Sequence, residues 1–170
     1  GIWDFAFFAN GDLAKEPERW DTIPVPSCWQ LHGYEHPNYA NVRYPYPVDP
    51  PYVPDINPMG VYRRSFTRED GQKKLYLVLE GVSSCAEIEV NGTYVGYTQG
   101  AHLQAEFDLS EVARTGENTL VIRVRKWCSG SYLEDQDFFR MNGIFRDVYL
   151  LSRPQGHVGD IKIIARNGSI

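Results

Sequence analysis

Proline placement is the feature that most limits how this chain of 170 residues can fold. Nine of its eleven prolines lie within residues 24–58. Proline has no backbone N–H to donate and its ring fixes φ, so it interrupts α-helices and enters sheets only at edges and bulges. We therefore expect residues 24–58, called here the proline-rich loop, to contain neither a helix nor a central strand.

Aromatic residues decide whether the proline-rich loop is ordered or a flexible linker. The loop contains Trp29, Tyr34, Tyr39, Tyr44, Tyr46 and Tyr52. Disordered linkers contain few aromatic residues, whereas loops that pack on themselves or line a site use them. We predict an ordered loop. His32, His36 and Asn41 are its side chains able to hydrogen-bond a hydroxyl group, although capping of local backbone is the more ordinary role of each.

Negative charge concentrates in a second segment, residues 127–148, called here the acidic loop. Its neighbouring acidic residues are Glu134, Asp135 and Asp137. Carboxylates taken out of water need cations or hydrogen-bond donors. Arg140 and Arg146 of the same loop could supply them in a structural ion-pair network. Alternatively, the partner is external: sugar hydroxyls or a hard cation such as Na⁺, Mg²⁺ or Ca²⁺. The residue types leave both readings open.

Outside these loops the sequence has the pattern of short β-strands. Leu120, Ile122 and Val124 alternate with a second set that includes Arg123 and Arg125, which is the period of a strand with one buried face. Strands are expected at residues 2–8, 20–25, 61–67, 74–80, 86–90, 93–98, 119–126, 144–151 and 160–165.

Two local signals add a turn and a helix to these strands. Asn91-Gly92 predicts a tight hairpin, because both central residues of a type I′ turn need positive φ. Asp108 followed by Glu111 resembles a capping box and predicts one short helix that ends at Gly116. Many short strands with almost no helix indicate an all-β fold, an antiparallel jelly-roll β-sandwich.

Chain length indicates the number of domains, and net charge indicates which classes of partner the chain does not suit. The length fits one domain, which we place at residues 1–165, with 166–170 as a frayed end or the start of a linker. A net charge of −5 and the lack of a Lys/Arg cluster argue against nucleic acid. No apolar run reaches membrane-spanning length. The high aromatic content, 14%, favours a carbohydrate or protein surface.

Cysteine usage indicates a reducing compartment. Cys28, Cys85 and Cys128 are odd in number and lack C-x-x-C spacing, so we expect free, mostly buried thiols rather than disulfides or a zinc site. This favours a cytoplasmic location. The chain opens at Gly1 without Met or a signal peptide, as an excised fragment would.

Two long motifs resemble the amino-terminal sugar-binding domain of β-galactosidases of glycoside hydrolase family 2. The first is VPSCWQLHGYEHPNYANVRYPYPVDPPYVPDINPMGVYRRSF, and the second is WCSGSYLEDQDFFRMNGIFRDVYLL. Their length and order make the resemblance specific, and it extends from Trp3 to about Ile163. It implies a jelly-roll domain that precedes an immunoglobulin-like domain and a TIM barrel in a longer enzyme.

The resemblance also implies where the chemistry takes place. Such enzymes are retaining glycosidases that hydrolyse terminal β-D-galactosyl linkages, and their two catalytic glutamates lie on the barrel, so this chain contains no catalytic residue and is expected to be inactive alone. Glu134 and Asp137 could be mistaken for such a pair. A single loop, however, offers no opposed faces across a glycosidic bond.

Residue-by-residue matching places two positions of this chain in the family's galactose subsite. Asn41 and Asp137 match residues that contact galactosyl hydroxyls, and Asp137 also matches a carboxylate that helps to hold Na⁺. Mg²⁺ is expected in the missing catalytic domain, and the full-length protein is expected to form a homo-oligomer. Phe139 replaces an expected Trp, Asn142 an expected Ser, and Cys28 a small polar residue. None of these departures affects Asn41 or Asp137.

Two other functions remain open at this point. The chain could be a free-standing carbohydrate-binding module, or lectin-like jelly roll, that binds a glycan without a catalytic partner. A purely structural reading makes the proline-rich loop an oligomer contact and the acidic loop a clamp for the fold.

Overall fold

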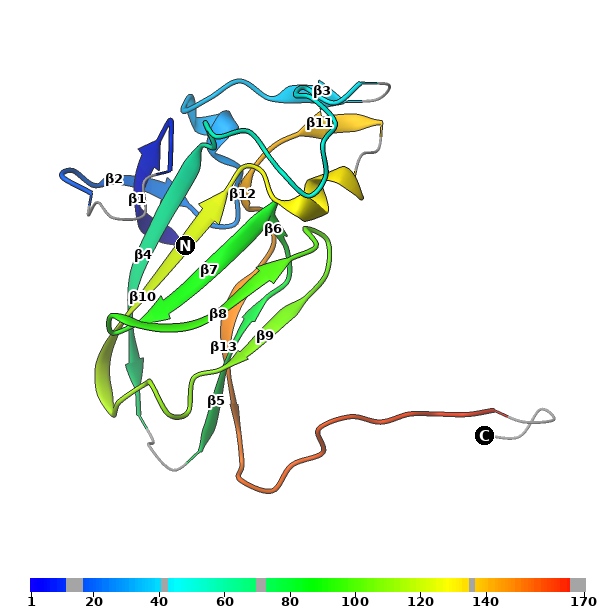
Figure 1. Ribbon diagram of the computed structural model, residues 1–170. Coiled ribbons are helices and arrows are strands. Elements are labelled where there is room, and N and C mark those ends of the chain that lie inside the picture. Colours follow the sequence, from blue (N-terminus) through cyan, green and yellow to red (C-terminus); the bar gives the residue numbers. More distant parts are fainter. Residues whose placement is uncertain (12–16, 41–42, 70–72, 135–136, 166–170) are drawn as a thin grey trace.

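The computed structural model describes residues 1–11, 17–40, 43–69, 73–134 and 137–165, and almost all of its regular structure is β (Figure 1). The strands are β1 (Ile2–Phe8), β2 (Asp21–Pro24), β3 (Asn38–Ala40), β4 (Met59–Arg68), β5 (Lys74–Leu79), β6 (Val82–Ser83), β7 (Cys85–Val90), β8 (Thr93–Gln99), β9 (Ala105–Asp108), β10 (Gly116–Arg125), β11 (Phe138–Arg140), β12 (Gly143–Ile144) and β13 (Val148–Arg153). Two single-turn 3₁₀ helices, η1 (Trp29–His32) and η2 (Ser129–Tyr132), lie in the two loops.

Antiparallel pairing joins the long strands into two sheets. The larger sheet has the order β2-β1-β4-β10-β7-β8, and the smaller has the order β13-β5-β9. The short pairs β3–β11 and β6–β12 lie apart from them. The hairpin between β7 and β8 turns at Asn91 (φ 54°) and Gly92 (φ 80°), which confirms the predicted positive φ of both residues.

One hydrophobic core fills the space between the two sheets. Ile122 and Val124 of β10 are fully buried, and they share the core with Leu77 and Leu79 of β5. The alternation read from residues 119–126 is therefore the alternation of a core-facing and an outward face. The predicted antiparallel jelly-roll β-sandwich is confirmed.

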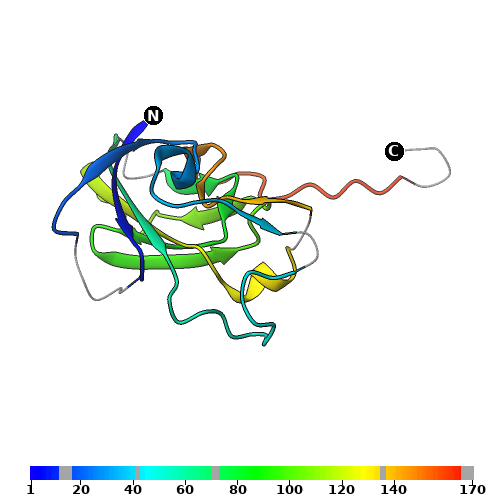
Figure 2. The ribbon, with the colours of Figure 1, turned by 90° about the horizontal axis from the view of Figure 1, so that it is seen from above.

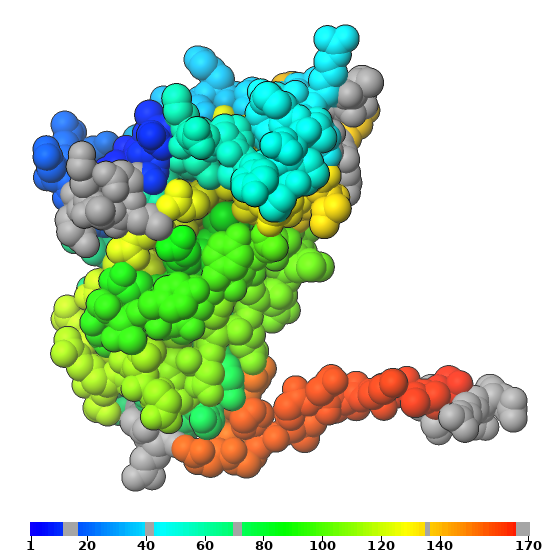
Figure 3. Space-filling model, in the orientation of Figure 1, coloured from blue at the N-terminus to red at the C-terminus, as the bar shows by residue number. Residues whose placement is uncertain are grey.

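Both loops that carry candidate residues lie at the same end of the sandwich. Seen from above, the proline-rich loop and the acidic loop run beside each other (Figure 2). The space-filling view shows their surfaces meeting over the top of the sheets (Figure 3). The last described residues leave the body at the opposite end (Figure 1).

The helix predicted after Asp108 is wrong: this segment makes one turn and then enters β10. Asp108 Oδ1 does accept the Ser110 amide at 2.8 Å, as a cap would, and the Ala113 amide donates to Leu109 O at 2.8 Å. Further helical turns would need free carbonyl groups. The buried Arg68 guanidinium instead donates to the carbonyl oxygens of Ser110 and Ala113.

Two strand predictions and one exclusion also need correction. Residues 144–151 contribute to two strands: β12 pairs with β6 and β13 with β5. Between them the amides of Phe145 and Arg146 both donate to Gly81 O, so the segment makes no continuous ladder. Residues 160–165 are exposed and lie in no strand, so burial does not select the extended pairing that their pattern predicted. The proline-rich loop does contain one 3₁₀ turn, η1.

Candidate functional site

The two loops are joined by a three-residue antiparallel ladder. β3 of the proline-rich loop pairs with β11 of the acidic loop, with Tyr39 opposite Phe139 and Asn38 opposite Arg140. Residues about a hundred positions apart in the sequence thereby come into contact. The two loops that carry the candidate residues are therefore in contact through this pairing.

Asp137 lies at the open end of this β3–β11 ribbon. Its carboxylate is exposed and accepts a hydrogen bond from the Tyr39 hydroxyl. The Tyr39 and Phe139 rings lie 5.4 Å apart between centroids and are 57% and 59% exposed. An accessible carboxylate next to two exposed aromatic rings offers hydrogen-bond acceptors beside an apolar surface, which suits a sugar. Asn41, which follows β3 directly in the sequence, lies outside the described residues.

Other predicted polar residues of the loops have local roles. Glu134 Oε1 accepts the Ala101 amide at 2.6 Å, and Arg146 Nη1 donates to His102 O at 3.2 Å. His32 and His36 are exposed on either side of the turn that follows η1. These contacts anchor the acidic loop to the β8–β9 connection and do not assemble a second polar site.

The ion-pair reading of the acidic loop does not describe Glu134 or Asp137. Among the residues with a described placement, neither carboxylate lies in an ion pair with Arg140 or Arg146. Arg140 is buried and donates from Nη2 to Ser131 O at 2.9 Å, within the same loop. Asp135 lies outside the described residues.

Aromatic packing orders the proline-rich loop, as predicted. The Tyr44 hydroxyl donates to Tyr132 O, and the Tyr132 hydroxyl donates to Tyr52 O, so the loop is tied to η2 at two points. The Tyr46 ring packs edge-on against Trp127, with 4.9 Å between centroids. The same contacts also hold η2 in place.

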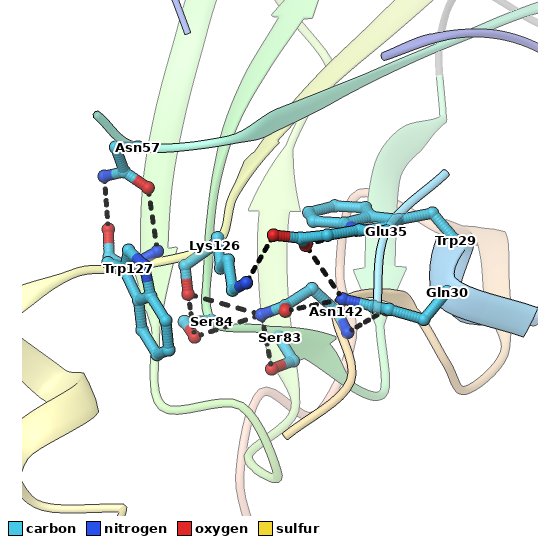
Figure 4. A network of polar contacts seen from close by, with 9 residues as sticks. All are labelled: Trp29, Gln30, Glu35, Asn57, Ser83, Ser84, Lys126, Trp127 and Asn142. Carbon is cyan, nitrogen blue, oxygen red and sulfur yellow. Dashed lines mark hydrogen bonds and ion pairs between the residues drawn. The ribbon is translucent and has the colours of Figure 1, made fainter. Parts of the chain in front are cut away.

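A buried network of polar side chains, the polar clamp, fixes the ends of both loops (Figure 4). Its members are Gln30, Glu35, Asn57, Lys126 and Asn142. Gln30 and Asn142 exchange two hydrogen bonds: the Asn142 amide donates to Gln30 Oε1 at 2.8 Å, and Gln30 Nε2 donates to Asn142 Oδ1 at 3.0 Å. The start of the proline-rich loop is thus attached to the end of the acidic loop.

The other loop ends are attached in the same way. Asn57 Nδ2 donates to Trp127 O at 2.9 Å, and the Trp127 amide donates to Asn57 Oδ1 at 3.0 Å. Lys126 forms a buried ion pair with Glu35, whose second carboxylate oxygen accepts Trp29 Nε1 at 3.3 Å. Each end of both loops therefore contacts an end of the other.

Sequence reasoning missed the polar clamp, although one signal for it was present. Lys126 continues the series Leu120, Ile122 and Val124, so it falls on the buried face of its strand. A lysine on a core-facing position requires a buried counter-charge. Glu35, the partner, lies 91 positions away, and no local pattern points to it.

A small cavity lies against β11, whose three residues all line it. It has a volume of about 170 Å³, and Glu134, Phe138, Phe139 and His102 are among the residues that line it. A larger cavity of about 310 Å³ lies at the open edge between the two sheets, lined by Trp3 and residues of β4 and β13, away from the candidate residues. Only the smaller one adjoins the β3–β11 ribbon.

The described residues offer a partial metal site at most. They contain no group of three or more His, Cys, Asp or Glu side chains placed to hold a metal ion. Asp137 supplies a single exposed carboxylate, with the Tyr39 hydroxyl beside it. A hard cation there would need its remaining oxygen ligands from elsewhere, which fits a shared site rather than a complete one.

The cysteines are free and buried, as predicted. Cys28, Cys85 and Cys128 form no disulfide. Burial raises the pKa of the Cys28 thiol to about 11. Within the described parts of the chain, we find no helix with the length and apolar character needed to cross a membrane.

Comparison with known proteins points in one direction. The chain is 46% identical over 175 residues to a β-galactosidase of Yersinia pestis (strain Angola) and to one of Yersinia pseudotuberculosis serotype O:1b (strain IP 31758). Each alignment covers 96% of this chain and 16% of the relative. The chain therefore spans about a sixth of the length of these curated relatives.

Solved structures share the fold at lower identity. An FMN-binding β-glucuronidase from Facaelibacterium prausnitzii L2-6 has a TM-score of 0.64 and 24% identity, over 91% of this chain and 22% of that one. A Bifidobacterium dentium β-glucuronidase complexed with coumarin-3-O-glucuronide has a TM-score of 0.65 and 19% identity, over 91% of this chain and 29% of that one. At this identity the likeness supports the fold alone.

A family model identifies the chain directly. The model described as "Glycosyl hydrolases family 2, sugar binding domain" matches residues 1–154, which include both loops and every strand of the sandwich. The extension of the domain to residue 165 stays a prediction. The chain belongs to the glycosyl hydrolases of family 2, as a sugar binding domain.

Proposed function

We propose that this chain is the sugar-binding domain of a longer β-galactosidase, to which it contributes part of the galactose subsite. Asp137 and Asn41 contact galactosyl hydroxyls, while the two catalytic carboxylates lie on another domain of the same chain. The names and the length of the Yersinia relatives support this reading. The substrate is a compound with a terminal β-D-galactosyl group.

The observation that carries the proposal is the β3–β11 ladder. It brings the acidic loop against the segment that leads into Asn41, and it leaves the Asp137 carboxylate exposed at the end of the molecule where both loops meet. An ionised carboxylate accepts hydrogen bonds from two hydroxyl groups, and such charge-assisted bonds are the stronger kind. Asp137 is thus suited to orient adjacent hydroxyls of one sugar ring.

The role assigned to these residues is positioning rather than proton transfer. A retaining glycosidase needs two carboxyl groups roughly 5 Å apart across the scissile bond. Glu134 accepts the Ala101 amide and Asp137 accepts the Tyr39 hydroxyl, and these separate contacts support a positioning role for Asp137. Hydrogen bonds to substrate hydroxyls raise turnover when they become stronger in the transition state.

A sodium ion shared with another domain is part of the proposal. Asp137 would supply one oxygen ligand from this chain, with the Tyr39 hydroxyl holding its carboxylate in place. When bound, the ion supplies positive charge that offsets the carboxylate and attracts hydroxyl oxygens. The remaining ligands come from residues outside this chain.

Substitution of Asp137 by Asn in the full-length enzyme tests the proposal. Asparagine keeps the shape of the side chain but removes its charge, so we expect kcat/KM for a β-galactoside to fall roughly 10- to 100-fold, the equivalent of about 1.5–3 kcal/mol. The sodium dependence of the rate should weaken in the same variant. Both are measured by steady-state kinetics across a series of Na⁺ concentrations at constant ionic strength.

Glu111→Gln is the matched control. It neutralises an exposed carboxylate on the turn between β9 and β10, outside both loops. This variant should keep the kinetics of the unmodified enzyme. If Asp137→Asn behaves as the control does, in rate and in sodium response, Asp137 is not in the subsite.

Three further expectations stay predictions. They are a homo-oligomeric full-length protein, Mg²⁺ bound by the catalytic domain, and a cytoplasmic location. The first would be measured by sedimentation of the full-length protein, and the second by metal analysis of the catalytic domain.

A further inference from the structure

A partly buried ion pair joins the proline-rich loop to Lys126, the residue that precedes the acidic loop, away from the proposed sugar site. The Lys126 ammonium group pairs with the Glu35 carboxylate, and their side chains are only 6% and 22% exposed. Removing two charges from water is costly, and well-packed apolar residues of similar size often replace such pairs without loss of stability. Stability alone therefore does not account for this pair.

Within the polar clamp, Glu35 links Lys126 to the side chains of Trp29 and Gln30. One carboxylate oxygen accepts Lys126, and the other accepts Trp29 Nε1 and Gln30 Nε2, both at 3.3 Å. Gln30 in turn exchanges two hydrogen bonds with Asn142. Glu35 thereby connects the proline-rich loop to the start and to the end of the acidic loop (Figure 4).

The polar clamp lies at one end of the β3–β11 ribbon. Glu35 precedes β3, which begins at Asn38, and Asn142 follows β11, which ends at Arg140. Asn38 and Arg140 pair across the ribbon, so both connections enter the ribbon at the same end. Asp137, next to β11, lies at the other end.

A ribbon this short does not determine its own register. An isolated pair of strands is marginally stable at best, and this one has only three residue pairs. A shift of one residue would move each side chain to the other face. Tyr39 would then no longer meet Asp137, and the Asp137 carboxylate would lose its orientation.

We propose that Glu35 and Lys126 are positioning residues for the sugar site: their ion pair sets the register of β3 against β11 and so places Asp137. The inference rests on the proposed role of Asp137 in galactose binding. Glu35 and Lys126 would affect that site although neither side chain touches the substrate. Their effect on catalysis is exerted entirely through Asp137 and the ribbon.

A double-mutant cycle in the full-length enzyme tests this. Glu35→Gln keeps the shape of the side chain but removes the charge that holds Lys126, and we expect kcat/KM to fall roughly tenfold. If Glu35 acts through Asp137, adding Glu35→Gln to Asp137→Asn should cost little more than Asp137→Asn alone. Losses that multiply in the double variant would overturn the inference.

A charge-balanced variant separates positioning from folding. Glu35→Gln combined with Lys126→Met leaves no unpaired buried charge, so we expect the unfolding temperature to recover toward that of the unmodified enzyme. The charge pair that we propose sets the register is still missing, so kcat/KM should stay low. Recovery of kcat/KM together with the unfolding temperature would show that the pair is only structural.

The control is another partly buried pair of a cation and a glutamate, on the outer face of the large sheet. Arg123 and Glu89 lie 2.8 Å apart on β10 and β7, and Glu89→Gln should leave kcat/KM unchanged. The outcomes also separate the two proposals. If Asp137→Asn has no effect, the proposed function fails; if it impairs the enzyme while Glu35→Gln does not, only the positioning role fails.

Discussion

At the scale of single residues, the proposed galactose subsite depends on how the Asp137 carboxylate is oriented. Asp137 is exposed, and within the described part of the chain its carboxylate accepts a hydrogen bond from the Tyr39 hydroxyl across the β3–β11 ribbon. An exposed side chain loses rotamer freedom when it binds a ligand. A neighbour that already restricts the carboxylate lowers that cost, so under the proposed function Tyr39 would contribute to galactose binding even without touching the sugar.

Tyr39→Phe should therefore weaken the enzyme without disturbing the fold. The variant retains the aromatic ring and its contact with Phe139 but loses the hydroxyl that Asp137 accepts. We expect kcat/KM in the full-length enzyme to fall roughly fivefold, the equivalent of about 1 kcal/mol. Tyr94→Phe, at an exposed position of β8, should have no effect. Equal kinetics for both variants would contradict the role of Tyr39.

The sequence predicted some of these residues and not others, for a physical reason. Asp137 and Asn41 were found from a motif, and the structure places Asp137 at the exposed end of both loops. Tyr39 was identified only as an aromatic residue of an ordered loop. Its contact with Asp137 follows from the pairing of β3 with β11. The register of that pairing depends on contacts between distant segments, which no local pattern encodes.

At the scale of elements, local preference and tertiary contacts compete. Strands with regular alternation, such as β10, were predicted within a few residues, because burial on one face imposes the same period on the sequence. The segment after Asp108 has a helix cap, but Arg68 binds the carbonyl groups that a helix would use. A distant side chain thus overrides a local signal.

Arg68→Met should reveal how much this element depends on that side chain. Arg68 donates to the carbonyl oxygens of Ser110, Ala113 and Lys73 at 2.9, 2.5 and 2.8 Å. Methionine leaves buried acceptors without these donors, so we expect the free energy of unfolding of this chain to fall by about 3 kcal/mol. Denaturant unfolding measures it. Arg19→Met, which removes an exposed ion pair with Asp21, should change it by less than about 1 kcal/mol. Similar losses in the two variants would contradict the argument.

At the scale of the whole molecule, the scaffold and the loops that carry the candidate residues occupy different parts of the sandwich. The shared core between the sheets fixes the scaffold, while both loops are carried at one end, where the polar clamp joins them. The fold class could be predicted because it rests on short strands and frequent turns. The polar clamp could not, since its members come from distant parts of the sequence.

Thiol and phenol groups at buried and partly buried positions make the stability of the chain sensitive to alkaline pH. Burial raises the pKa of Cys28 from 9.0 to about 11 and that of Tyr46 from 10.0 to about 12, and it also raises the pKa of Tyr62. As the pH rises, the unfolded chain loses these protons first. The stabilisation that these groups contribute is therefore fully present below pH 9 and is lost as the pH passes through 11 and 12.

Cys28→Ala tests this loss of stability at the lower end of the pH range in which it occurs. For the unmodified chain under reducing conditions, we expect the denaturant midpoint to fall between about pH 8 and pH 10.5, because each unit of pKa difference is worth about 1.4 kcal/mol. The variant starts from a lower midpoint, since the buried side chain is shortened, but its loss over the same interval should be smaller. Tyr94→Phe, an exposed phenol, should lose as much as the unmodified chain. An identical pH dependence in Cys28→Ala would mean that other buried groups carry the alkaline sensitivity.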